Sequence, residues 1–321
     1  YYIDEGFRFD QALVFLDVSD IYDEMFIKFD DEGNILTYEE TKNRSLPKKI
    51  FYSVGRFLRD NSTIFRFLNI LSDRTELTKN YIKLKIKTSK DLNKGFFNSL
   101  LHKRPYVRAK IAMSEDQKTA FIKNDQQWIT CKESREDSQK YRALSDLILT
   151  GTGTIERDNP FLNVRDEEIL KLKGFQQPAR GIITSSKLET SLNFFSAQGK
   201  KYIFCRDKNI FKNFRKDEAV SIVEIENTED NKINLNELLK RIHSLKINDI
   251  LLESGPTLIT SFINQDLIDE FIIYIAPKML SNTALSFFDG DQSKSPFNSK
   301  QFQLIEESRI KEDKKLIFKR I

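Results

Sequence analysis

From about residue 80 to its C-terminus the chain alternates short apolar runs with helical segments, and this alternation restricts the fold more than any other feature. Such alternation is typical of an α/β domain, in which helices cover a mostly parallel sheet. We expect Thr130 to begin the first of the helices, and residues 302–308 and 315–320 to close the sheet as an antiparallel pair. The other predicted strands are 105–113, 146–150, 181–184, 201–205, 249–253 and 270–276, and the predicted helices are 132–144, 235–245 and 258–264.

Residues 1 to about 90 do not share this pattern, so we treat 1–90 as a separate N-terminal segment without an assigned family, and 91–321 as the main domain. After the apolar stretch 25–29, a turn sequence rich in Asp and Gly at 30–34 predicts a hairpin with Ile35. Apolar residues recur at helical spacing over 48–71. This stripe faces either the core or a partner or membrane surface.

Charge and composition exclude several functions. Lys and Arg total 52 against 48 Asp and Glu, and this dispersed excess of four positive charges does not indicate nucleic-acid binding, although it leaves an anionic small molecule open. No apolar run approaches 18 residues and no charged-then-apolar leader opens the chain, so we expect no membrane span and no signal peptide. Because the sequence starts at Tyr1 and not at Met, it leaves open where the natural chain begins.

The scarcity of cysteine and histidine bears on both compartment and chemistry. Cys131 and Cys205 belong to no CxxC pair, which favours a reducing compartment and a cytoplasmic location. With only His102 and His243, a His-rich zinc site, a nucleobase-deaminase zinc site and a serine-histidine triad are not expected. We therefore predict no metal.

Two predicted strands end in residues suited to ligand binding, since ligands of α/β sheets collect beyond the carboxyl ends of strands. The first strand runs into Gly151-Thr152-Gly153-Thr154, where glycines let backbone N–H groups approach a phosphate. A tight turn that needs positive φ explains the same glycines. The second ends in Glu253, followed by a Gly-Pro helix start. Glu253 could hold sugar hydroxyls, or it could cap the helix dipole.

Two residues near these strand ends are further candidates. Arg165 ends the segment 158–165, which follows the glycine-rich segment within a few residues. It could clamp an anion, because a guanidinium fork matches phosphate geometry, or it could lie in solvent. Trp128 is the only tryptophan, and we expect it to be a core or wall aromatic in preference to a stacking platform.

Taken in order, these pieces and their neighbours match one family. From about Asp91 to the C-terminus the chain resembles the reductase domain of the bacterial bifunctional riboflavin-biosynthesis deaminase/reductase. The matching segments are LNKGFF (92–97), RPYVRAKIAMS (104–114), QWIT (127–130), Arg142-Ala143, TGTGT (150–154), DNPFLNVR (158–165), Gln177-Pro178, ESGP (253–256), LIDE (267–270) and APK (276–278).

The resemblance implies a dihydrofolate-reductase-like α/β fold, a mostly parallel sheet flanked by helices. It implies NADPH-dependent reduction of the ribosyl group of 5-amino-6-(5-phosphoribosylamino)uracil to a ribityl group, by hydride transfer to the sugar C1′ without a protein nucleophile. It also implies a homodimer. Substrate-binding positions of the family match Lys110, Gln126, Arg142, Leu162, Arg165 and Glu253, and its NADPH contacts match Ala112, Trp128, Thr154, Asp158, Ser185, Gly255, Pro256 and Thr257.

The chain departs from the family in several places. Gln126 replaces a serine that contacts substrate, Gln117 replaces a glycine of a turn, and Ser281 replaces another glycine. The N-terminal segment has neither the H-A-E nor the P-C-x-x-C motif of the family's zinc deaminase. Two alternatives therefore remain beside the uracil reductase: a reductase that acts on the diaminopyrimidinone before deamination, and a non-catalytic dihydrofolate-reductase-like binding module.

The apolar segment 270–276 gives the homodimer modest support from the residues themselves. It is more apolar than an exposed strand should be, so a partner could cover it, although burial on both faces within one chain explains it equally well.

Overall fold

The computed structural model describes residues 94–120, 128–172, 174–212, 217–229, 232–280 and 284–321, and two short strands before them. These strands, β1 (Lys28–Phe29) and β2 (Ile35–Leu36), pair antiparallel and confirm the predicted hairpin. The predicted helix over 48–71, the division near residue 90, Gln126 and Ser281 lie outside the described residues.

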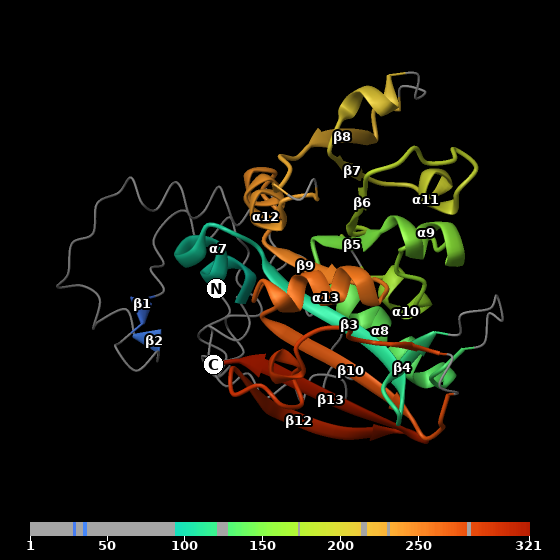
Figure 1. Cartoon of the computed structure of the whole chain (residues 1–321), viewed down its shortest axis with the longest axis vertical. Coiled ribbons are helices and arrows are strands. Elements are labelled where there is room, and N and C mark those ends of the chain that lie inside the picture. The colour runs from blue at the N-terminus through green and yellow to red at the C-terminus, as the bar shows by residue number, and fades with distance from the viewer. Residues whose placement is uncertain are drawn as a thin grey trace, which may run out of the picture.

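A nine-stranded sheet forms the centre of the domain in the order β12-β13-β10-β3-β9-β5-β6-β7-β8 (Figure 1). The strands from β10 to β8 are all parallel, while β13 and β12 continue the sheet antiparallel at one side. The closing pair and the mostly parallel sheet are thereby confirmed. The bounds are β3 (Tyr106–Ser114), β5 (Leu147–Gly151), β6 (Ala179–Thr184), β7 (Lys201–Cys205), β8 (Val220–Glu224), β9 (Asp249–Leu252), β10 (Glu270–Ala276), β12 (Phe302–Ile310) and β13 (Asp313–Arg320).

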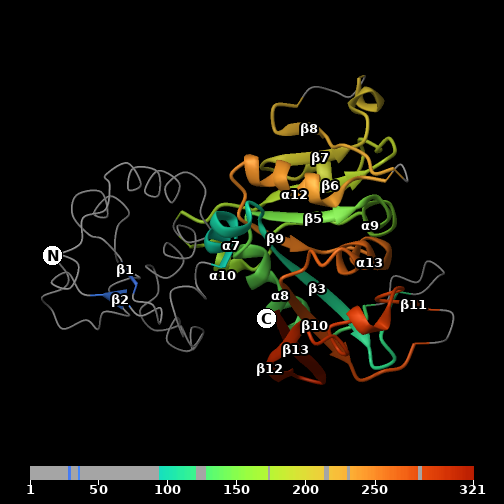
Figure 2. The same cartoon turned by 60° about the vertical axis from the view of Figure 1, so that its left-hand side comes forward.

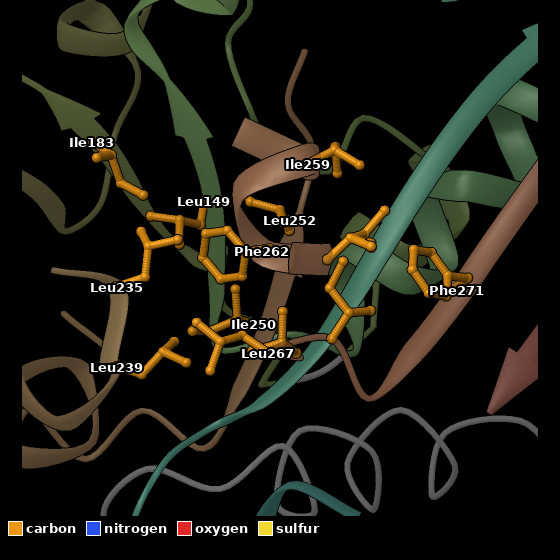
Figure 3. Close-up of a cluster of buried hydrophobic side chains, with 14 of the residues drawn as sticks. Leu149, Ile183, Leu235, Leu239, Ile250, Leu252, Ile259, Phe262, Leu267 and Phe271 are labelled. Carbon is orange, nitrogen blue, oxygen red and sulfur yellow. The ribbon is translucent and has the colours of Figure 1, made fainter. Parts of the chain in front are cut away.

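Helices cover both faces of the sheet (Figures 1 and 2). On one face, α12 (Leu235–Ser244) and α13 (Pro256–Asn264) bury Leu235, Leu239 and Phe262 against Leu149 and Leu252 (Figure 3). On the other, α9 (Thr152–Asp158) and α11 (Asn193–Ser196) pack on the strands β5 to β7, and α8 (Lys132–Ala143) packs beside β9 and β10. The remaining elements are α7 (Lys94–His102), α10 (Glu167–Leu170), η3 (Lys208–Phe211), η4 (Gln292–Lys294) and the short antiparallel pair β4 (Lys118–Ala120) with β11 (Leu285–Ser286). No helix within the described ranges combines the length and apolar character needed to cross a bilayer.

Two sequence-based interpretations of these elements are wrong. Thr130 does not cap α8, because the N-cap is Cys131, whose backbone N–H donates to Asp313 Oδ2 at 2.8 Å. The apolar strand β10 is covered within the chain, since it lies between β3 and β13 and Phe271 and Ile273 have no exposed surface. Its composition therefore reflects a central strand and gives no sign of a partner.

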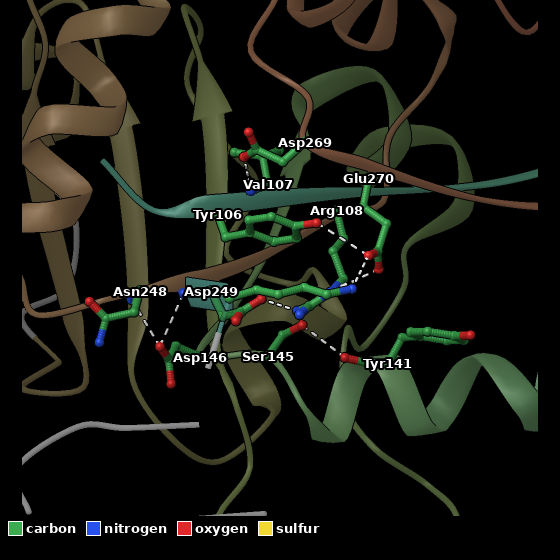
Figure 4. A network of polar contacts seen from close by, with 11 residues as sticks. Tyr106, Val107, Arg108, Tyr141, Ser145, Asp146, Asn248, Asp249, Asp269 and Glu270 are labelled. Carbon is green, nitrogen blue, oxygen red and sulfur yellow. Dashed lines mark hydrogen bonds and ion pairs between the residues drawn. The ribbon is translucent and has the colours of Figure 1, made fainter. Parts of the chain in front are cut away.

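A buried polar network joins three strands at the amino edge of the sheet (Figure 4). Arg108 of β3 forms ion pairs with Asp249 of β9 and with Glu270 of β10, and the Tyr106 hydroxyl donates to Glu270 at 3.2 Å. Burial raises the pKa of Asp249 to about 7, with a further increase from Asp146 and an opposing effect of Arg108. The network fixes the amino ends of β3, β9 and β10 in mutual register.

Helix α7 is attached to the same amino edge. Lys94 Nζ lies 2.5 Å from Glu270 Oε2. A Cβ atom on Gly95 would lie 2.5 Å from Asp249 Oδ2 and 2.8 Å from the Asn248 carbonyl oxygen, so only glycine allows the helix to come this close. This contact gives a physical reason for the Lys-Gly pair of the first matching segment.

Candidate active site

The centre of the candidate site is an ion pair between Glu253 and Arg142. Glu253 follows β9 directly, and Arg142 lies in the last turn of α8. Arg142 donates from Nε and Nη2 to the two carboxylate oxygens at 2.8 and 2.7 Å, and its Nη1 donates to the Asn163 carbonyl oxygen at 2.9 Å. Both side chains are nearly buried, at 11% and 13% exposed. Because α13 has no side-chain cap, the capping interpretation of Glu253 is wrong.

Lys110 lies beside this pair. The register of β3 with β9 matches Ala109 to Leu252, so the next residues, Lys110 and Glu253, adjoin each other on one face of the sheet. Burial lowers the pKa of Lys110, although the Glu253 charge opposes this effect. Burial alone would raise the pKa of Glu253, but Arg142, Lys110 and Arg165 lower it overall. The carboxylate is thus held ionised next to an amine that can donate hydrogen bonds.

Arg165 gives the site an excess of positive charge. Its backbone N–H donates to Gln139 Oε1 at 2.8 Å, and its side chain is exposed. The guanidinium forms no ion pair with a carboxylate in the described part of the chain. Burial and the nearby Arg142 both lower its pKa. Three cations around the single carboxylate Glu253 make an arrangement suited to a phosphate group.

The loop that carries Arg165 holds a strained conformation. Leu162 is 2% exposed and has a φ of 49°, and Asn159 has a φ of 39°, both in the left-handed region that non-glycine residues rarely adopt. Gln177 fixes the loop from outside, since its side-chain amide exchanges two hydrogen bonds with the Val164 backbone at 2.9 and 2.8 Å. Strain of this kind clusters at ligand sites, where it pre-positions backbone groups.

Two polar residues at this site carry buried atoms with no partner. Thr150 Oγ1 and Asn163 Oδ1 make no hydrogen bond to any residue that the structure describes. The register of β5 with β9 pairs Leu149 with Leu252, so the next residues, Thr150 and Glu253, are neighbours on the same face of the sheet. A buried polar group without a partner costs about 1–3 kcal/mol and calls for a bound ligand or water. Neither residue was predicted as a site residue, because a Thr in a strand and an Asn in a loop carry no signal of their own.

The predicted cofactor residues begin at the ends of β5 and β9. Gly151 is the N-cap of α9, and neither Gly151 nor Gly153 has a positive φ, so the tight-turn interpretation of these glycines is wrong. A Cβ on Gly153 would meet nothing within 4 Å, which leaves its backbone open to a ligand. Thr154 Oγ1 accepts the Gly255 N–H at 3.0 Å and so joins the starts of α9 and α13. The first-turn N–H groups of both helices lack helical acceptors and fit the phosphates of a dinucleotide.

The remaining predicted cofactor residues lie on α13, β3 and α9 and directly after β6. Pro256 is the first residue of α13, as predicted, Thr257 and Ser185 are exposed, and Ala112 is half-buried on β3. Asp158, at the end of α9, is half exposed and lies 3.2 Å from the neighbouring Arg157.

Trp128 differs from the prediction. It is 70% exposed, so the interpretation as a core aromatic is wrong. The Arg135 guanidinium lies 4.6 Å from the centre of its ring, and Lys278 Nζ donates to its carbonyl oxygen at 2.8 Å. These contacts leave much of the ring open to a ligand.

Gln117 occupies a turn in which the family that the sequence resembles has glycine. Its φ is 59°, a value that glycine adopts without strain. Its N–H donates to the Ser114 carbonyl at 3.0 Å and its own carbonyl accepts from the Phe287 N–H at 3.0 Å. The turn therefore keeps a left-handed residue although the glycine is gone.

One group of potential metal ligands occurs in the described part of the chain. Cys131, Glu312 and Asp313 bring their ligand atoms within 4.8 Å of one another. Asp313 serves there as the acceptor for the N-terminus of α8, and burial raises the pKa of the Cys131 thiol, which disfavours the thiolate that a metal needs. Both Cys131 and Cys205 are free, as expected.

Comparison with known proteins agrees with this geometry. The family model of the RibD C-terminal domain matches residues 105–316. The riboflavin biosynthesis protein RibD of Buchnera aphidicola subsp. Baizongia pistaciae is 35% identical over 243 residues, which are 72% of this chain and 64% of that protein. The 5-amino-6-(5-phosphoribosylamino)uracil reductase of Buchnera aphidicola subsp. Acyrthosiphon pisum is 38% identical over 201 residues, 60% of this chain and 95% of that protein.

A solved structure gives the same result. Acinetobacter baumannii RibD superposes with a TM-score of 0.61 at 28% sequence identity, over 72% of this chain and 62% of that one. The fold is thus that of the RibD reductase domains, as the sequence predicted. The chain belongs to the family of RibD C-terminal domains. It spans somewhat less than two thirds of the length of the RibD proteins that it matches.

Proposed function

We propose that residues 91–321 form an NADPH-dependent reductase of riboflavin biosynthesis, which converts the ribosyl group of 5-amino-6-(5-phosphoribosylamino)uracil to a ribityl group. The observation that carries the proposal is the buried Arg142–Glu253 pair beside Lys110 and Arg165, next to the joined starts of α9 and α13. The similarity to a relative named as the uracil reductase, covered over 95% of its length, supports the same activity.

Different residues of the site are suited to bind the phosphate and the sugar of the substrate. Arg165 and Arg142 are suited to bind the substrate phosphate, since both carry guanidinium groups and only Glu253 offsets their charge. Lys110 and Glu253 are suited to hold the hydroxyls of the open sugar chain, with the amine as donor and the carboxylate as acceptor. NADPH, when bound, supplies the hydride. The protein's own part is to align the sugar C1′ with the nicotinamide and to exclude water, which lowers the barrier without a protein nucleophile.

The proposal predicts that the purified protein oxidises NADPH when the phosphoribosylaminouracil is supplied. The diaminopyrimidinone, assayed in parallel, tests the alternative reductase, which differs only in the base. Because no step requires a metal, treatment with EDTA is expected to leave the rate unchanged, and elemental analysis is expected to find no stoichiometric zinc. Absence of NADPH oxidation with both pyrimidines would support the non-catalytic binding module instead.

We also propose a symmetric homodimer and a cytoplasmic location. The free thiols of Cys131 and Cys205 suit a reducing compartment and therefore the cytoplasm.

The homodimer is proposed at the edge strand β12, which exposes the apolar side chains of Leu304 and Ile305 at 43% and 49%. Strand β10 offers no such exposed edge. Light scattering at micromolar concentration is expected to give twice the mass of the chain. A monomeric mass under the same conditions contradicts the dimer.

A further inference from the structure

A buried group of polar side chains lies beside Lys110 and has no part in the site described above. Asp137 of α8 accepts two hydrogen bonds at Oδ2, from the Tyr274 hydroxyl of β10 at 2.8 Å and from Lys315 Nζ of β13 at 2.7 Å. Tyr274 is 1% exposed, and the side chains of Lys315 and Asp137 are 9% and 12% exposed. Contacts from two other elements therefore fix the hydroxyl end of the Tyr274 ring.

The strand register places this ring on the face of the sheet that carries the site. Strand β10 pairs with β3 so that Tyr274 lies opposite Ala112 and Ile272 lies opposite Lys110. Alternate residues of a strand share a face, so Tyr274 and Lys110 both lie on the face covered by α8. Lys110 Nζ lies 5.9 Å from the centre of the Tyr274 ring, within the distance at which an aromatic face attracts an ammonium.

The ring contact leaves the donors of Lys110 free. Lys110 Nζ forms neither a hydrogen bond nor an ion pair with any residue that the structure describes. The charged groups around it are Glu253 after β9 and both Arg142 and Arg135 of α8. An aromatic face holds an ammonium without accepting its N–H groups in ordinary hydrogen bonds, whereas a carboxylate would accept them. All three donors of Lys110 thus remain available to a ligand.

The protonation states of the anchoring residues keep the ring in place around neutral pH. Burial, together with the Asp137 charge, raises the pKa of Tyr274 well above its usual value, so the hydroxyl stays a donor. Burial alone would raise the pKa of Asp137, but Lys315 and Lys140 lower it overall. The hydrogen bond therefore joins a neutral phenol to an ionised carboxylate, the stronger kind of hydrogen bond.

We propose that Tyr274, anchored by Asp137 and Lys315, is a positioning residue that holds the Lys110 ammonium where the sugar hydroxyls bind. The inference rests on the role of Lys110 in the proposed function. A lysine has a long flexible side chain, and one that is ordered before the ligand arrives costs no ordering entropy on binding. The alternative is that the anchoring residues only tie α8 to the sheet. Tyr274 would then contribute to stability and not to sugar affinity.

D-ribitol 5-phosphate tests the inference without turnover, because it has an open sugar chain and a phosphate but no base. Calorimetric titration of the full chain gives its affinity relative to that for inorganic phosphate, which lacks the sugar hydroxyls. We expect Tyr274→Met to lower this affinity ratio by about 2- to 12-fold, the range for ordering one long side chain on binding. Tyr274→Phe keeps the aromatic face and is expected to retain most of the ratio.

A double-mutant cycle distinguishes positioning through Lys110 from a purely structural role. Lys110→Met alone is expected to lower the affinity ratio, and Tyr274→Met in that background is expected to lower it no further. Equal effects of Tyr274→Met in both backgrounds overturn the inference, and so does a wild-type ratio in folded Tyr274→Met. If Tyr274→Met does not fold, Asp137→Asn replaces it in the cycle. Asp137→Asn is expected to lower the ratio by less, and only where Lys110 is present; an unchanged ratio there overturns the inference.

Tyr202→Met is the matched control, since Tyr202 is a buried tyrosine of β7 whose ring stacks on Phe204. It should lower the melting temperature and leave the affinity ratio unchanged, and thermal melting also shows which variants are folded. If Tyr274 and Lys110 are coupled but neither pyrimidine is reduced, the inference stands and the proposed function fails. If Lys110→Met leaves the ratio unchanged, the inference fails, and NADPH oxidation still decides the proposed function.

Discussion

Replacing Arg142 with Ala is expected to lower kcat/KM for the pyrimidine substrate by about 100-fold or more, and to destabilise the fold. The variant removes a phosphate donor, worth about 1.5–3 kcal/mol. It also leaves Glu253 without its bidentate partner and removes the hydrogen bond to the Asn163 carbonyl oxygen in the loop that carries Arg165. Loss of one partner from a buried pair costs about 3 kcal/mol or more of folding free energy. Steady-state kinetics and urea unfolding measure the two effects separately.

Arg165→Ala is the matched control for this prediction. Its guanidinium is exposed and pairs with no carboxylate in the described ranges, so we expect a raised KM with little change in the free energy of unfolding. The double variant Arg142→Ala, Glu253→Gln should recover part of the stability, because it removes the unpaired charge. A stable Arg142→Ala variant with wild-type kinetics contradicts the assignment of Arg142 to the site.

Glu253→Ala is expected to reduce kcat/KM by about 10- to 100-fold, as the loss of charged hydrogen bonds to the sugar hydroxyls predicts. Glu253→Gln keeps the size and part of the hydrogen bonding, so its activity should fall less. NADPH affinity should change little in either variant, since Glu253 pairs with Arg142 and not with the N-terminus of α13.

Fluorescence titration with NADPH and kinetics with the pyrimidine distinguish these outcomes. Equal loss of NADPH affinity and of pyrimidine reduction would place Glu253 at the cofactor and not at the sugar. Wild-type efficiency in a folded Glu253→Ala protein rules out the assignment altogether.

The sequence predicted the fold where apolar periodicity is strong. Segments 201–205 and 270–276 form strands with the predicted bounds, because buried parallel strands are continuous apolar runs. It missed β8, a half-buried edge strand with a charged end, and the helices α10 and α11, each a single turn too short for periodicity. The start of α8 was also wrong, since its capping acceptor, Asp313, comes from a distant part of the chain.

For the site, too, the sequence predicted individual residues but not the contacts between them. The family resemblance picked out Arg142 and Glu253, which the structure joins, and Thr154 and Gly255, which contact each other. It did not indicate which candidates touch, because bidentate pairing and strand register arise only in three dimensions. Gln139, which holds the Arg165 backbone, and the unpartnered Thr150 hydroxyl belong to segments whose residue types suggest nothing about ligands.

The attachment of α7 through Lys94 and Gly95 has a consequence for how such a domain can be joined to other sequences. The chain enters the domain at the amino edge of the sheet, whereas Glu253 and Thr154 follow the carboxyl ends of their strands. Polypeptide upstream of α7 therefore connects to the domain at the edge remote from the ligands. This polarity allows the polypeptide before α7 to change in evolution while the domain keeps the geometry of its site.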